Sequence, residues 1–159
     1  MRLSRLRRRR GATLVEVSLS LLPLMAMMIG IIDLAVPMFI KSTFTHAVRE
    51  GVRYGITYRT QNGKTHSESI RSVVQEASLG FLAGDEGASR IAVRFYTPSG
   101  VEATGADRNA GGNIVEVSIT GYQWNWIAPL WRSGVPITIN AVSSDRLEVL
   151  PRGTALPSP

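Results

Sequence analysis

A long, mostly apolar run covers residues 12–40 and follows a cluster of arginines at the start of the chain. Residues 17–32, between Glu16 and Asp33, carry no charge. Because a helix rises about 1.5 Å per residue, about twenty residues cross the roughly 30 Å hydrocarbon core of a bilayer. The sequence therefore predicts a transmembrane helix over residues 12–40, preceded by a basic leader, residues 1–11. The arginines of this leader are Arg2, Arg5, Arg7, Arg8, Arg9 and Arg10.

The arginine cluster also predicts the direction of this helix, because basic residues before a span keep the N-terminus in the cytoplasm. Residues beyond Lys41 are then expected outside, with Asp33 near the outer interface, where water can reach it. A cleaved secretory signal peptide is the alternative. The run is longer than the roughly 7–15 apolar residues of such a peptide, and no small-residue cleavage site follows it. We expect a single-pass protein of the inner membrane, with a periplasmic or extracellular C-terminal domain.

The net charge of +6 suggests nucleic-acid binding, but the excess is confined to the leader. The chain has 18 basic and 12 acidic side chains, and six of the basic ones lie in residues 1–11, which hold no acid. The remainder is therefore balanced, whereas binding to a phosphate backbone needs a basic face on the folded domain. No nucleic-acid partner is expected. The lack of cysteine excludes disulfide frameworks, iron–sulfur clusters and thiolate catalysis.

Gly11 and Ala12 join the leader to the apolar run, and Glu16 follows one helical turn later. Cleavage after Gly11 would expose the α-amino group of Ala12, which has a pKa of about 7.7–8.0 and is largely protonated at neutral pH. An acid in a span costs about 2.5–3.5 kcal/mol at mid-bilayer and less near the interface. The Ala12 amine of a neighbouring helix could offset this cost. Alternatively, Thr13-Leu14-Val15-Glu16 is a capping box at a helix start.

This junction resembles the type IV prepilin leader, in which a basic leader ends in glycine and the following apolar helix has glutamate at its fifth position. Within that class the chain resembles the TadE-like minor pilins, or pseudopilins, of the tight-adherence (Tad or Flp) pilus system. The motifs that carry the resemblance are Arg10-Gly11-Ala12 with Val15-Glu16, Gly30-Ile31-Ile32-Asp33, and His46-Ala47-Val48-Arg49-Glu50-Gly51-Val52-Arg53-Tyr54-Gly55.

The resemblance implies a precursor that a prepilin peptidase cuts after Gly11. It also implies a part in Tad pilus assembly or secretion, and so in adherence, together with other pilin or pseudopilin subunits and the Tad assembly machinery. A minor role is implied because the major pilins of this system are little more than the helix. No enzyme activity and no cofactor are expected. The rival interpretation is an uncleaved, single-span periplasmic module that binds other proteins.

Residues 41–58 keep helical spacing and are expected to continue the first helix beyond the membrane. Small side chains recur every four residues on one face, at Thr43, Ala47, Gly51 and Gly55. Two glycines within five residues weaken a helix, so this stripe indicates close packing against another element. Either the chain's own domain fills the groove or a neighbouring subunit does.

Residues 41–150 are expected to form one small α+β domain outside the membrane. Thr65-His66-Ser67-Glu68 is a capping box for a second, amphipathic helix, which Gly80 or Gly84 would end.

Three segments with alternating apolar residues predict a small antiparallel three-stranded sheet after these helices. These segments are 90–96, 113–123 and 135–149. Pro136 belongs at the start of its strand or on an edge. The tail, 151–159, is expected to be disordered.

The three tryptophans, Trp124, Trp126 and Trp131, lie close together between the second and third strands. They are candidates for contact with a partner subunit or with the membrane interface, where aromatic residues concentrate. Equally, they could cover a small core. The sequence has no phosphate-binding loop, no nucleophile elbow and no metal-spaced histidine pair, so no catalytic or metal-binding residue is predicted. His46 and His66 are twenty residues apart on different elements.

Overall fold

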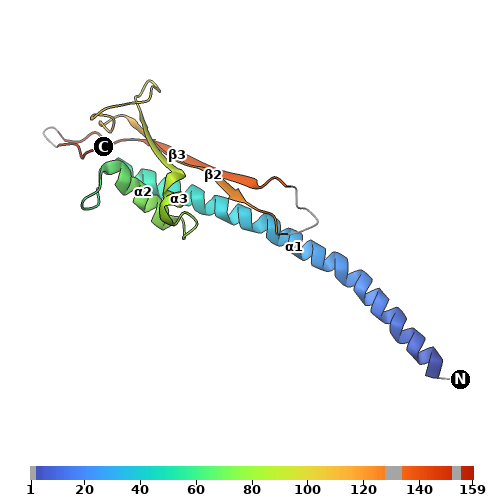
Figure 1. Ribbon diagram of the computed structural model, residues 1–159. Helices are drawn as coiled ribbons and strands as arrows, with labels where there is room; N and C mark the ends of the chain where they lie inside the picture. The colour runs from blue at the N-terminus through green and yellow to red at the C-terminus, as the bar shows by residue number, and fades with distance from the viewer. Residues whose placement is uncertain (1–2, 128–133, 152–154) are drawn as a thin grey trace.

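The computed structural model describes the backbone of residues 3–127, 134–151 and 155–159, and the side chains in these ranges from residue 13 onward. A long helix, α1 (Leu3–Ile56), carries a small domain on its C-terminal half (Figure 1). The domain adds two short helices and a three-stranded antiparallel sheet. The predicted α+β class is confirmed.

Helix α1 is continuous over 54 residues, or about 80 Å at 1.5 Å per residue. Pro23 and Pro37 lie inside it, and each removes one backbone hydrogen bond. The Gly11–Ala12 junction lies within this helix. No helix therefore begins at Thr13 in the uncut chain, and the alternative interpretation of the Glu16 motif as a capping box does not hold there.

Helix α2 (His66–Ala77) begins as predicted. Thr65 is its N-cap, with Glu68 N–H donating to Thr65 Oγ1 at 3.3 Å and Thr65 N–H donating to Glu68 Oε2 at 2.8 Å. The helix ends earlier than expected, at the cap residue Ser78. A further short helix, α3 (Gly84–Ser89), follows where the sequence predicted only a helix end.

The sheet consists of β1 (Ile91–Tyr96), β2 (Ile114–Trp124) and β3 (Ile137–Arg146), in that spatial order. One face packs on α1 and α2 and the other faces outward (Figure 1). As the alternation predicted, β2 points three fully buried side chains at the helices. They are Val115, Val117 and Ile119. Pro136 directly precedes β3, so it removes no ladder hydrogen bond.

The core lies between the C-terminal half of α1, helix α2 and the inner face of the sheet. Phe44 of α1 is fully buried and meets the rings of Phe81 and Tyr122 edge-on, with centroids 6.3 and 5.0 Å away. Such edge-to-face aromatic pairs add about 0.5–1.5 kcal/mol each beyond burial. The domain thus packs directly on the C-terminal half of α1.

The end of the chain, for which the sequence predicted disorder, touches the domain at two points. The carbonyl of Ser158 accepts the His66 N–H at 2.8 Å, and that of Pro157 accepts Asn109 Nδ2 at 2.9 Å. The first backbone N–H groups of a helix have no acceptor within the helix, so a distant segment can supply one. The composition of the tail does not predict such a contact.

Candidate assembly and membrane surfaces

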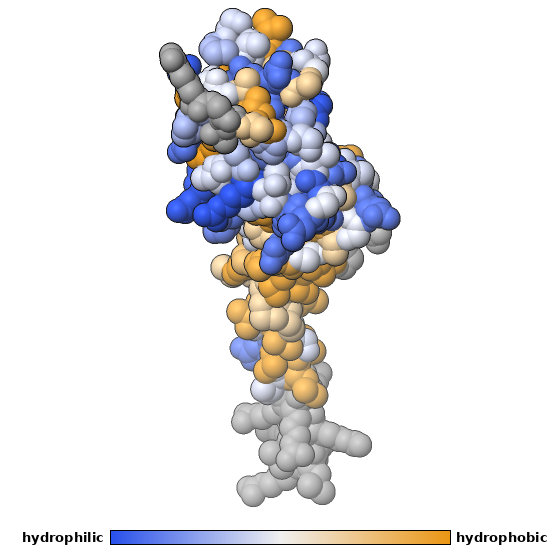
Figure 2. Space-filling model, turned by 90° about the vertical axis from the view of Figure 1, so that its left-hand side faces the viewer, coloured by the Kyte–Doolittle hydropathy of each residue, from blue (hydrophilic) through white to orange (hydrophobic). Residues whose placement is uncertain are grey.

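The N-terminal half of α1 is an apolar rod that the domain leaves uncovered. Helix α1 is long and apolar enough, from Thr13 onward, to cross a membrane by length and composition. Leu14, Leu19, Leu22 and Met27 are each at least two-thirds exposed. Figure 2 shows this hydrophobic surface below a largely hydrophilic domain. Exposed apolar area of this extent requires lipid or other protein around it.

Glu16 lies on this rod, and its side chain is exposed. It makes no ion pair with another residue that the structure describes. Its neighbours in a shallow surface groove are Val17, Ser20, Leu21 and Leu24. The arrangement therefore presents an acid among apolar side chains, open to a cation from outside the chain. For Gly11 and Ala12 the structure describes the backbone alone.

The small-residue stripe faces the chain's own domain. Ala47 is fully buried, and Thr43 is 8 % exposed. A Cβ on Gly51 would lie 2.4 Å from Val74 Cγ2, and one on Gly55 would lie 2.9 Å from Ile70 Cδ1. Of the two alternatives, the structure shows packing against helix α2 and the sheet of the same chain. The stripe fastens the domain to the C-terminal half of α1.

The opposite face of this part of α1 is polar and uncovered. Arg49, Glu50 and Arg53 are exposed, as is His46, and they line a groove together with Lys41. These side chains form a solvated face of the helix.

The expectation that Asp33 meets water at the outer interface is wrong. The Asp33 side chain is 1 % exposed. Its Oδ1 accepts a 2.7 Å hydrogen bond from the backbone N–H of Ile127, in the segment after β2. Asp33 is buried because a carboxyl in an apolar helix is stabilised by any hydrogen-bond donor that reaches it, from water or from the protein. The sequence indicates that such a donor is needed, but it does not show where the donor comes from.

A bulge in β2 turns the aromatic side chains toward α1. Ile119 pairs with Ala141 and Tyr122 with Ile139, so Thr120 and Gly121 oppose Asn140 alone. Before the bulge the odd-numbered residues of β2 point inward. After it, Tyr122 and Trp124 are half-buried while Gln123 is exposed. Gly121 has φ of +72°, which glycine adopts without strain.

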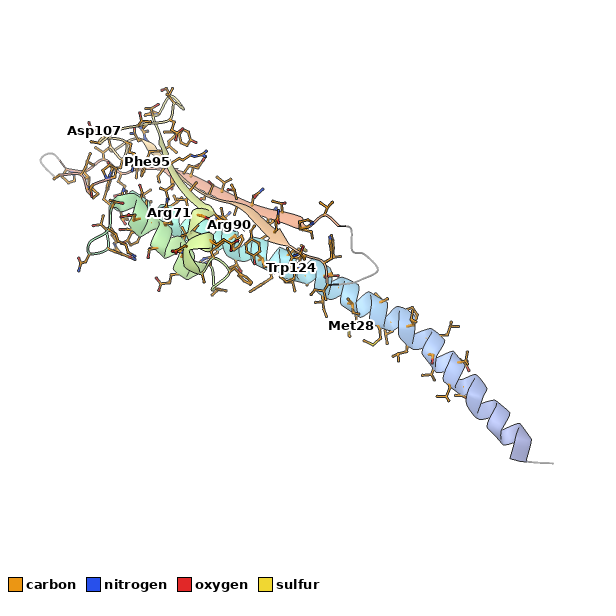
Figure 3. All side chains as sticks on the ribbon, viewed as in Figure 1. Met28, Arg71, Arg90, Phe95, Asp107 and Trp124 are labelled. Atoms are coloured by element: carbon orange, nitrogen blue, oxygen red, sulfur yellow. The ribbon has the colours of Figure 1, made fainter. Side chains whose placement is uncertain are left out.

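Trp124 lies where the β2–β3 hairpin meets α1 (Figure 3) and packs against the core. Trp126 lines an apolar groove with Gly30, Ile31 and Leu34 of the rod. Of the two expectations for the tryptophans, Trp124 covers the core and Trp126 lies against the rod. Trp131 is outside the described residues. Sequence reasoning missed the bulge, although a glycine inside a strand is its usual signal.

His66 is fully buried beneath the C-terminal end of α1. Its Nε2 donates to the Gly55 carbonyl at 3.0 Å, and Nδ1 accepts from Asn109 Nδ2 at 3.4 Å. The ring stacks on Tyr58, with centroids 5.6 Å apart. Burial lowers the pKa of His66, against the opposing effect of its bond to Gly55. It is a structural histidine.

The described part of the chain holds no group of three or more histidine, aspartate or glutamate residues that could bind a metal ion.

These features define a class of protein: an α+β domain fixed to one long helix, whose exposed apolar half fits a single-pass membrane protein. Residues 11–53 match the TadE family, described as TadE-like protein. Over these residues the chain is TadE-like, which confirms the resemblance carried by its motifs. The family is a structural, non-enzymatic class associated with the Tad pilus. No curated protein and no solved structure matches the chain.

Proposed function

We propose that this protein is a minor pilin or pseudopilin of a Tad pilus system, cut after Gly11 by a prepilin peptidase. The observation that carries the proposal is the family match, which starts at Gly11 and runs through the rod to Arg53. The processed chain takes part in pilus assembly or secretion, and so in adherence. Its partners are other pilin or pseudopilin subunits, the Tad assembly machinery and the membrane.

The rod supports this function because its surface suits two environments. In the precursor, lipid covers the exposed apolar side chains of residues 13–32, with the leader in the cytoplasm and the domain outside the inner membrane. Cleavage removes residues 1–11 and the six arginines that hold this end at the cytoplasmic face. The same apolar side chains can then pack against the rods of other subunits.

Glu16 supports assembly rather than anchoring. An exposed acid on an apolar rod is unfavourable in lipid, at up to about 2.5–3.5 kcal/mol. Cleavage creates a cation, the α-amine of Ala12, at the end of each rod. Pairing Glu16 of one subunit with the Ala12 amine of the next would neutralise both charges and set the axial offset between rods.

The stripe of Thr43, Ala47, Gly51 and Gly55 has a supporting role in this proposal. Because it packs the domain tightly onto α1, the rod and the domain move together when a subunit enters or leaves an assembly.

The experiment is expression of the full chain with a Tad prepilin peptidase, followed by immunoblotting of membranes and sheared pili. Gly11→Ala is expected to remain at full length. Glu16→Gln is expected to be cut but to be depleted from the pilus fraction. Val17→Ile, next to Glu16, is the matched control and should be both cut and incorporated. Cleavage of Gly11→Ala at the same bond would contradict the assigned site.

One observation favours the rival function, an uncleaved membrane-tethered module that binds other proteins. Helix α1 runs without a break through Gly11 and Ala12, from Leu3 onward. In that case the wild-type chain would stay at full length beside an active peptidase, and Gly11→Ala would change nothing.

A further inference from the structure

The end of β2 and the start of β3 lie beside the middle of α1 (Figure 1). We call the described residues at this end of the hairpin, 124–127 and 134–136, the hairpin tip. The Ile127 N–H bonds to Asp33 at 2.7 Å, so the tip lies beside the rod at the level of Asp33.

The positions of the charged residues along α1 indicate how deep Asp33 lies relative to the bilayer. Between Glu16 and Lys41 the sole charged residue is Asp33, and it is buried. The helix therefore presents no exposed charge over residues 17–40, which is about 36 Å at 1.5 Å per residue and exceeds the roughly 30 Å hydrocarbon core. Asp33 lies eight residues, or about 12 Å, on the membrane side of Lys41. The hairpin tip is thus level with the boundary between acyl chains and headgroups.

The surface of the tip suits that boundary. Its described residues carry no charge. Ile127 is 55 % exposed and Val135 is 72 % exposed. The groove between Trp126 and the rod is lined mainly by apolar residues, including Met27 and Ile31, which are themselves more than half exposed. The apolar surface of the rod therefore continues onto the tip, and tryptophan is typical of this depth.

We propose that the hairpin tip is a second membrane contact, which rests in the outer leaflet while lipid acyl chains fill the groove between Trp126 and α1. The Asp33–Ile127 bond holds the tip against the rod at this depth. The inference rests on the proposed membrane-spanning position of residues 13–32, and it adds a lipid-binding surface on the domain itself.

The chain has no cysteine, so single cysteines can carry a nitroxide spin label without a background signal. Full-length protein is reconstituted in vesicles of phosphatidylcholine and phosphatidylglycerol. The labelled variants are Ile127→Cys at the tip, Leu22→Cys on the rod and Val142→Cys, an exposed position farther along the same hairpin. Each label is tested for relaxation by oxygen, which partitions into lipid, and by a water-soluble nickel chelate.

At Ile127 we expect strong relaxation by oxygen and loss of relaxation by nickel, and at Val142 the reverse. Nickel reaching Ile127 would place the tip in water. Protection of Ile127 from both reagents would mean that protein covers it. Either result overturns the inference, provided that the label at Leu22 is relaxed by oxygen and not by nickel. Nickel reaching Leu22 would instead contradict the membrane span, and with it both the inference and the topology on which it rests.

A second measurement leaves Trp126 and Ile127 unchanged. Trp124→Phe/Trp131→Phe retains Trp126 as the sole tryptophan, and its emission is recorded in vesicles with brominated acyl chains. Bromine near the headgroup end of the chains should quench Trp126 more than bromine at mid-chain. Equal emission in brominated and ordinary lipid would overturn the inference.

Discussion

The backbone N–H of Ile127 donates a hydrogen bond to Asp33 Oδ1 at 2.7 Å, between residues 94 positions apart in the chain. This bond joins the end of the β2 segment to the middle of α1. It buries the one acid that interrupts the apolar surface between Glu16 and Lys41. The hairpin is thereby connected to α1 at the membrane end of the domain, while the small-residue stripe packs α1 against helix α2 and the sheet farther along.

Asp33→Ala should release the segment around Ile127. Leaving a buried donor without its partner costs about 1–3 kcal/mol, so hydrogen–deuterium exchange of the Ile127 amide should become markedly faster. Asp33→Asn retains a carbonyl acceptor and should give a smaller increase. Exchange in β1 is the internal control. An Ile127 amide in Asp33→Ala as protected as in the wild type would contradict this account of the bond.

Gly51→Ala should destabilise the domain because the new Cβ would lie 2.4 Å from Val74 Cγ2. Overpacking costs about 1–3 kcal/mol, against about 1 kcal/mol gained in helix propensity. Thermal unfolding in detergent should show a lower midpoint. Gly30→Ala, in the same helix with open space around it, is the matched control and should not lower the midpoint.

In a Val74→Ala background the obstructing methyl group is absent, so adding Gly51→Ala should no longer destabilise. A Gly51→Ala protein as stable as Gly30→Ala would show that the stripe does not fasten the domain.

Acidification should destabilise the domain through His66. Burial lowers its pKa in the folded state, so the unfolded chain binds more protons below its ordinary pKa of 6.5. The stability is therefore present above about pH 6.5 and falls as the pH drops through the lower, folded value. Denaturant unfolding between pH 7.5 and 5 (roughly) tests this and avoids most of the titration of Glu68, whose pKa is lowered by its capping bonds to Thr65.

His66→Gln should lower stability at neutral pH and flatten its dependence on pH. His46→Gln, at an exposed position, is the control and should keep the wild-type slope. A wild-type slope in His66→Gln would assign the pH dependence to another group.

Gly121→Val should destabilise the hairpin because the bulge holds this residue at φ of +72°. A left-handed conformation costs an ordinary L-residue about 1–2 kcal/mol, whereas asparagine tolerates it better. Space is not limiting, since the nearest atom to a Cβ there is Arg90 Nη1 at 3.7 Å. Chemical denaturation should rank the wild type first, then Gly121→Asn, then Gly121→Val. Equal stability of the two variants would argue against a conformational cause.

Local signals in the sequence predicted the elements but not their contacts. The capping box at Thr65 is encoded within four residues, and the inner face of β2 follows from alternation up to Ile119. The change of phase at Gly121 depends on pairing with Asn140 in another strand. For that reason the inward position of Trp124 could not be derived from spacing.

The same distinction applies to the candidate surfaces. The apolar rod and Glu16 could be recognised because charge and hydropathy along one helix are sequence properties. The partner of Asp33 could not, because it comes from a segment 94 residues away. The small-residue stripe indicated close packing, but only the position of Val74 shows that helix α2 packs against it.

In the proposed function the chain loses its basic leader and keeps its apolar rod. Intact mass spectrometry of the protein, extracted from membranes that contain a Tad prepilin peptidase, measures both changes at once. We expect a chain that begins at Ala12 and ends at Pro159, with the rod retained. A mass corresponding to Met1–Pro159, or to a product cut beyond residue 40, would contradict it.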